Sequence, residues 1–95
     1  MNKYESVIII QPNLDEEAVK ALTKKFSDLI EKNGKVESVE EIGKKKLAYP
    51  VKKNPEGFYA LINFESDGTI ISELERNFRI TDEVIKFIVI RKDEK

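Results

Sequence analysis

The residues best suited to chemistry are lysines, and they gather in one segment. Residues 43–53 read GKKKLAYPVKK and hold five lysines and no acid, with Lys44, Lys45 and Lys46 in a row. Lysine ammonium groups bind phosphates as point charges, and phosphate contacts dominate the affinity of proteins for nucleic acids. Tyr49 in the same segment suits stacking on a base or packing on a protein. The segment indicates a phosphate-binding surface, with a plain solvated face as the alternative.

The other polar residues do not form a recognisable catalytic pattern. The chain has no histidine and no cysteine, which excludes imidazole bases, thiolate nucleophiles and disulfides. Acidic residues cluster at 15–17 and 37–41, where helix capping and a solvated strand edge explain them. No serine has an activating histidine, no GxGxxG or GxxxxGK motif occurs, and no carboxylates stand at the spacing of a metal-binding loop. We therefore expect no enzyme, no small-molecule substrate, no cofactor and no metal site.

The length and composition predict one small domain. A chain of 95 residues fits a single domain over residues 1–95, with a short charged tail at 92–95. Its 17 basic and 18 acidic side chains leave a net charge of −1, so any affinity for nucleic acid must be local. No apolar run approaches the ~20 residues of a membrane span, and the run at 7–10 is too short for a signal peptide. We expect a cytoplasmic protein without a membrane partner.

Hydrophobic patterns predict six elements in the order strand, helix, strand, strand, helix, strand. The strands are expected at residues 4–11, 35–51, 58–65 and 84–91. The first helix is expected to be capped by Asn13 and closed by a left-handed Asn33–Gly34 pair. The second is expected to be capped by Ser66 or Asp67 and to end at 80–82.

This order predicts the ferredoxin-like βαββαβ fold of the α+β class. Right-handed crossovers then place both helices on one face of a four-stranded antiparallel sheet. Gly43 predicts a bulge in the second strand, and residues 54–57 predict the turn that follows it.

Both faces of the predicted sheet carry apolar side chains. We assign seven alternating residues to the helix side: Phe58, Ala60, Ile62, Phe64, Ile85, Phe87 and Val89. The other face should be polar if water covers it, yet six apolar residues are expected there. They are Leu47, Tyr49, Tyr59, Leu61, Ile88 and Ile90. Such a patch is typical of a partner site, and the alternatives are that lysine stems cover it or that the chain self-associates.

The lysine segment resembles the signature of a bacterial ribosomal family, that of small-subunit protein six. The signature has a glycine, a variable residue, two basic or polar residues, Leu-Ala-Tyr, usually Pro-Ile, and a polar residue. Residues 43–52 read GKKKLAYPVK, with Val51 in place of the usual isoleucine. Further features match in order along nearly the whole chain: Tyr4-Glu5, Pro12-Asn13-Leu14, Gly34, Glu40-Glu41, Gly57-Phe58-Tyr59 and Phe78-Arg79-Ile80.

The resemblance implies a non-enzymatic structural component of the small ribosomal subunit. Members of the family pair with ribosomal protein eighteen, and the pair binds the central domain of the small-subunit RNA in the platform. The apolar patch is then the expected site of the protein partner. The resemblance also implies RNA contacts by six basic residues: Lys3, Lys44, Lys45, Lys46, Arg79 and Arg91.

Other functions on the same fold remain as alternatives, because a fold alone does not define a function. The main one is a small-molecule-binding regulatory domain that dimerises through its sheet and forms a polar ligand cleft. An acyl-phosphate hydrolase would need an arginine-lined phosphate cradle with a positioned asparagine, which cannot be assembled from this sequence. An RNA-recognition motif would need paired aromatic residues in a glycine-rich basic run, and Tyr59 stands without that context.

Overall fold

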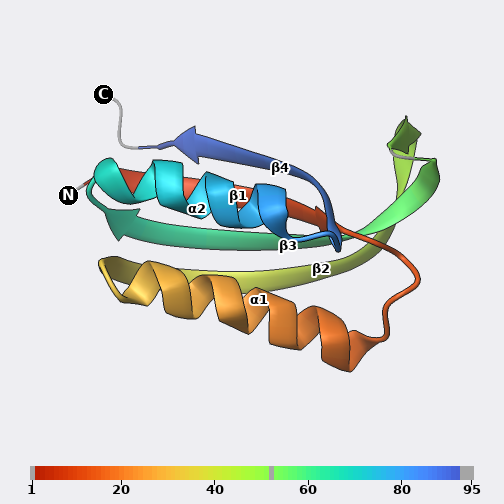
Figure 1. Ribbon diagram of the computed structural model, residues 1–95, viewed down its shortest axis with the longest axis horizontal. Coiled ribbons are helices and arrows are strands. Elements are labelled where there is room, and N and C mark those ends of the chain that lie inside the picture. Colours follow the sequence, from red (N-terminus) through yellow and green to blue (C-terminus); the bar gives the residue numbers. More distant parts are fainter. Residues whose placement is uncertain (1, 52, 93–95) are drawn as a thin grey trace.

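The structure, a computed structural model, describes residues 2–51 and 53–92, without the side chains at positions 48, 49 and 51. It contains the six predicted elements in the predicted order. They are β1 (Asn2–Ile10), α1 (Glu16–Glu31), β2 (Gly34–Val51), β3 (Asn54–Ser66), α2 (Thr69–Ile80) and β4 (Val84–Arg91). The strands form one antiparallel sheet in the order β2-β3-β1-β4, and both helices cover the same face (Figure 1). The ferredoxin-like α+β fold is confirmed.

The core lies between this sheet face and the two helices. Phe26 of α1 and Phe78 of α2 meet edge to face with ring centroids 4.7 Å apart, the arrangement that aromatic quadrupoles favour. Ile8 of β1 and Ile62 and Phe64 of β3 are fully buried beneath them. Every second residue of β3 points inward, as the alternating pattern predicted.

The helix caps differ from the predicted ones. Asp15, not Asn13, caps α1, and its Oδ1 accepts a hydrogen bond from the Ala18 backbone N–H at 2.9 Å. Asn13 is not available because it forms part of the turn that leads out of β1. The N-cap of α2 is Gly68, without a side-chain bond, because strand pairing continues through Ser66.

The predicted glycine roles are partly correct. Gly43 has a φ of 109°, and the β2–β3 register shifts between Glu41 and Gly43, which confirms the bulge. Gly34 does not form a left-handed cap, since α1 ends at Glu31 and its C-cap residue, Lys32, has right-handed backbone. Gly34 instead opens β2 where a Cβ would collide with Ser66 of β3. Close strand packing, rather than backbone conformation, therefore requires glycine at that position.

The β2–β3 turn also lies earlier than predicted. Val51 pairs with Asn54, so the chain reverses between them, and Lys53 adopts a positive φ of 68°. The predicted turn residues 54–57 belong to β3, where a Cβ at Gly57 would collide with a β1 side chain.

Strands β2 and β3 extend beyond the rest of the sheet. The β1–β3 pairing ends where Ile10 meets Phe58, so residues 44–51 and 53–57 extend beyond it as a two-stranded ribbon, which we name the hairpin arm. Figure 1 shows this arm curving away from the four-stranded sheet at the end opposite the two chain termini. The arm carries the lysine segment away from the core.

Candidate interaction surfaces

The sheet face without helices, the open face, carries a row of apolar side chains across three strands. Val7 of β1 pairs with Leu61 of β3 on one side and with Ile88 of β4 on the other. All three alternate with buried residues of the core and point away from the helices. Leu61 and Val7 are half-buried, and Ile88 is 45% exposed. The row is contiguous because antiparallel pairing sets such residues ~5 Å apart.

A second apolar row lies beside the first, toward the hairpin arm. Tyr59 pairs with Ile9, which is only 7% exposed. Ile85 also reaches this face, because Val84 pairs with Ile10 and Lys86 with Ile9, which leaves Ile85 as an extra residue. Its Cδ1 lies 3.6 Å from the position of a Cβ at Gly57, on the same side as Ile9. The assignment of Ile85 to the helix side is therefore wrong, since the bulge turns it toward the open face.

Four of the six predicted partner-binding residues share this face: Tyr59, Leu61, Ile88 and Ile90. Leu47 does not share their rows, because it follows Lys46, which pairs with Glu56 in the hairpin arm. The side chain of Tyr49 lies outside the described residues. The sequence patterns did not single out Val7 and Ile9. All four residues of the run 7–10 are apolar, so the pattern does not show which of them face away from the helices. That becomes clear only once β1 is known to be a central strand. We name Val7, Ile9, Tyr59, Leu61, Ile88 and Ile90 the apolar patch.

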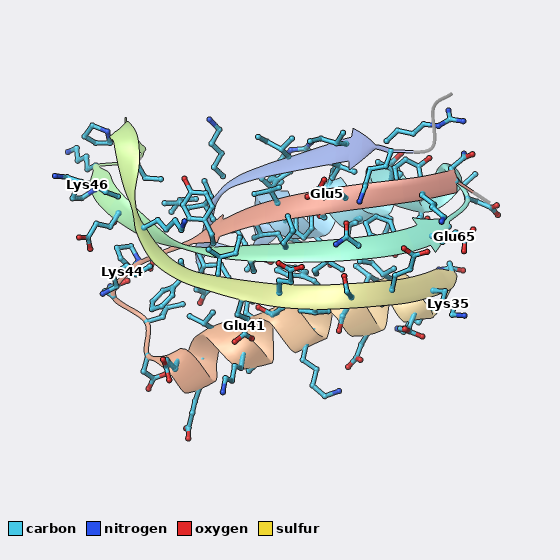
Figure 2. The ribbon with its side chains drawn as sticks, turned by 180° about the vertical axis from the view of Figure 1, so that it is seen from behind. Glu5, Lys35, Glu41, Lys44, Lys46 and Glu65 are labelled. Carbon is cyan, nitrogen blue, oxygen red and sulfur yellow. The ribbon has the colours of Figure 1, made fainter. Side chains whose placement is uncertain are left out.

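The far half of the open face is polar. Asn63 donates a hydrogen bond to the Ser38 hydroxyl at 3.0 Å and accepts one from the Lys92 ammonium at 3.1 Å. The Lys3 ammonium lies 4.0 Å from a Glu37 carboxylate oxygen. In Figure 2, Lys35 and Glu65 lie at this end, opposite Lys44 and Lys46. The open face is therefore mainly polar at the far end and mainly apolar beside the arm. Ile90 lies in the row of Glu5 and Asn63, and Lys86 lies in the row of Ile9.

The hairpin arm presents the lysines. Lys44, Lys45, Lys46 and Lys53 are all exposed, and Figure 2 shows Lys44 and Lys46 at the arm. The Lys44 ammonium lies 5.4 Å from the ring centroid of Phe58, within the range of a cation–π contact. The stem of Lys44 is thereby oriented while its charge stays in water.

The other predicted RNA contacts lie elsewhere. Lys3 pairs with Glu65, seven residues along β3 from Phe58, which places it roughly 23 Å from the base of the arm. Arg91 lies at the same far end and donates from Nη2 to Asn2 Oδ1 at 3.1 Å. Arg79 is exposed in the last turn of α2, on the helix side. The six basic residues thus divide into three lysines in the arm, two residues at the far end of the sheet and Arg79 on the helix side.

The described residues contain no group of three or more acidic residues able to hold a metal ion. None of the helices in residues 2–51 and 53–92 is both long and apolar enough to cross a membrane.

The fold and its surfaces together define a class of protein: a small ferredoxin-like domain whose sheet has an apolar patch on its open face and a basic hairpin arm. Comparison with known proteins gives the family. The family model of ribosomal protein S6 matches residues 3–91, so the chain belongs to the ribosomal protein S6 family. Members are structural proteins of the small ribosomal subunit. The family thus places the chain in the cytoplasmic ribosome, a ribonucleoprotein of translation.

Individual relatives agree with this assignment over most or all of their length. The small ribosomal subunit protein bS6 of Clostridium novyi is 50% identical over 95 residues, covering 99% of this chain and all of that protein. The bS6 protein of Clostridium kluyveri is 52% identical over 96 residues, covering all of both chains. The crystal structure of 30S ribosomal protein S6 from Thermotoga maritima superimposes with a TM-score of 0.91 at 40% identity. That alignment covers 96% of this chain and 87% of the other.

Proposed function

We propose that this chain joins a protein partner to ribosomal RNA in the small subunit, without catalysing a reaction. The apolar patch binds ribosomal protein eighteen, and the lysines of the hairpin arm bind phosphates of the central domain of the small-subunit RNA. The observation that carries the proposal is the apolar row of Val7, Leu61 and Ile88 on a face that the chain's own helices leave open. This row supports a protein partner because contiguous exposed apolar side chains mark interaction sites.

Burial of the patch supplies the affinity for the protein partner. Ile88 and Ile90 are 45% and 46% exposed, so a partner can still remove much of their surface from water. At ~25 cal/mol per Å² of apolar surface, each well-buried side chain contributes on the order of 1–2 kcal/mol. Tyr59 and Leu61 are already half-buried, so they shape the surface but contribute less binding free energy than Ile88 and Ile90.

The lysines contribute to RNA binding in a different way. Phosphate contacts position a protein on RNA without reading its sequence. The chain as a whole carries a net charge of −1, so the attraction of the arm is opposed by acidic residues elsewhere. We therefore expect the isolated chain to bind RNA weakly, and a basic protein partner to be needed for tight binding.

A binding titration tests this division of roles. A central-domain fragment of small-subunit RNA is titrated with the chain alone, with protein eighteen alone, and with both together. We expect tight binding only with both proteins. Tight and specific binding by the isolated chain would overturn the proposed need for a partner.

The regulatory-dimer alternative makes a different prediction for the same surface. If the open face served self-association, the chain would sediment as a dimer and protein eighteen would not dissociate it. Sedimentation velocity of the isolated chain, with and without protein eighteen, separates the two functions. We expect a 1:1 complex of the two proteins.

A further inference from the structure

The helix side of the molecule carries a second hollow surface, between α1 and α2. One cavity of about 570 Å³ is lined by α1 residues between Ala21 and Lys32 and by Asn77 of α2. A second cavity of about 390 Å³ is lined by Leu14, by α1 residues and by Thr81 and Glu83. The two cavities share Ala21 and Lys25, so we treat them as one interhelical groove.

The dimensions of the groove suit a helix. The α1 residues that line it run from Ala18 to Leu29, a rise of about 17 Å along the helix, and this length exceeds a compact small molecule. Half-buried Leu22 and Leu29 form an apolar floor, and Ala18 and Ala21 leave room above it. An elongated apolar groove between two packed elements is the surface that an amphipathic helix recognises.

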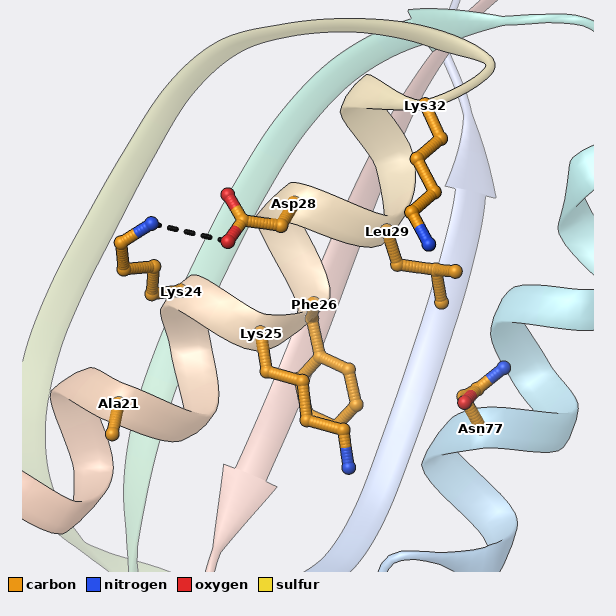
Figure 3. Close-up of a pocket in the computed structure, with 8 residues that line it drawn as sticks. All are labelled: Ala21, Lys24, Lys25, Phe26, Asp28, Leu29, Lys32 and Asn77. Atoms are coloured by element: carbon orange, nitrogen blue, oxygen red, sulfur yellow. Dashed lines mark hydrogen bonds and ion pairs between the residues drawn. The ribbon is translucent and has the colours of Figure 1, made fainter.

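The charges along the groove select an acidic partner. Lys24 pairs with Asp28 at 3.1 Å, so these two charges neutralise each other (Figure 3). Lys25 and Lys32 are exposed, and no ion pair of either occurs in the described part of the chain. They lie seven residues, or about two helical turns, apart on α1. Figure 3 shows Lys32 beside Leu29, on the side of α1 that faces Asn77 of α2. Glu83 lines the far end of the groove, so the two ends of the groove differ in charge.

An exposed isoleucine lies on the α2 side. Ile80 is 66% exposed, more than Ile88 or Ile90 of the apolar patch. It follows Asn77 by three residues, so both lie on the same side of α2. Its neighbour Thr81 lines the second cavity, whereas Ile80 itself is not among the lining residues of either cavity.

We propose that the interhelical groove docks an acidic amphipathic helix of another protein. Two carboxylates of that helix, two turns apart, pair with Lys25 and Lys32, and the apolar side chains between them pack on Leu29. The site lies on the opposite side of the sheet from the apolar patch, so it stands or falls independently of the proposed function.

A synthetic helix tests the proposal with the full chain. The probe is an amphipathic peptide of about 18 residues with two glutamates two turns apart and leucines between them. It is titrated into the isotope-labelled protein and followed by amide chemical shifts. We expect saturable shifts confined to α1 and the second half of α2. Lys25→Glu combined with Lys32→Glu should weaken binding about tenfold or more. The matched control Lys20→Glu, which lies on α1 but lines a different cavity, should leave the affinity unchanged.

The contrary outcomes are equally specific. The proposal is overturned if no saturable shifts occur up to about 1 mM peptide, or if the shifts map to the open face. It is also overturned if a control peptide with lysines in place of the glutamates binds equally well, or if a short RNA duplex competes for the groove. Because the charge-reversal sites are exposed, the far-ultraviolet circular dichroism of each variant should match that of the unmodified chain.

Discussion

At the scale of single residues, one buried hydroxyl stands out. Ser6 of β1 is fully buried, and its Oγ is the one buried side-chain polar atom without a hydrogen-bond partner in the described residues. It faces the helix layer, between Ile62 and Val89 in the sheet pairing. A buried polar group without a hydrogen-bond partner costs about 1–3 kcal/mol.

Removing that hydroxyl should stabilise the chain. We expect Ser6→Ala to raise the free energy of unfolding by about 1 kcal/mol, because the variant no longer buries an unpaired donor and acceptor. Urea denaturation of the variant and the unmodified chain measures the difference. A loss of stability of similar size would show instead that a buried water satisfies the hydroxyl.

Ile88 is the residue that tests the apolar patch. We expect Ile88→Asp to weaken binding of ribosomal protein eighteen at least about tenfold, because a carboxylate would be desolvated at the interface. Isothermal titration calorimetry provides the affinity, and Ile80→Asp is the matched control on the helix side. Equal affinity of the Ile88 variant and the unmodified chain would remove the patch from the interface.

At the scale of elements, local sequence patterns correctly predicted the strands that are defined by their own periodicity. The 84–91 run and the alternation in 58–65 depend on side chains close in sequence, and both predictions are correct. Caps and turns depend on distant partners. Ser66 cannot cap α2 because it pairs with Asn2 and Gly34, which no local pattern reveals.

The start of α1 can be tested by substitution. Asp15→Ala should lower the free energy of unfolding by about 1 kcal/mol, because the Ala18 N–H loses its acceptor. Asn13→Ala, the control, should change it by less than about 0.5 kcal/mol, as expected for a position outside the cap. Thermal unfolding followed by circular dichroism measures both. The reverse ranking would mean that the helix begins at the predicted Asn13 cap.

At the scale of the whole molecule, sequence patterns predicted the candidate surfaces only in part. Tyr59, Leu61, Ile88 and Ile90 were found because each strand alternates. The central position of β1, which adds Val7 to the patch, follows from the order of strands and is a property of the assembled sheet. The grouping of the predicted RNA contacts likewise required the register, since Lys3 and the arm lie at opposite ends of β3.

The cluster of lysines in the hairpin arm predicts a salt effect on the whole complex. Changing Lys44, Lys45 and Lys46 to glutamine should reduce the slope of log affinity against log salt by roughly three. The measurement uses the ternary complex with protein eighteen and a central-domain RNA fragment. The matched control changes Lys20, Lys24 and Lys25 of α1 to glutamine and should leave the slope unchanged. Equal slopes for both triple variants would show that the arm is not the RNA contact.

The central claim is that the sheet face without helices receives the protein partner. Hydrogen exchange of the chain, alone and bound to ribosomal protein eighteen, measures this most directly. We predict that binding protects amides of β1, β3 and β4 around Val7, Leu61 and Ile88 and leaves α1 and α2 unchanged. Protection confined to the helices, with these strands unaffected, would contradict the account.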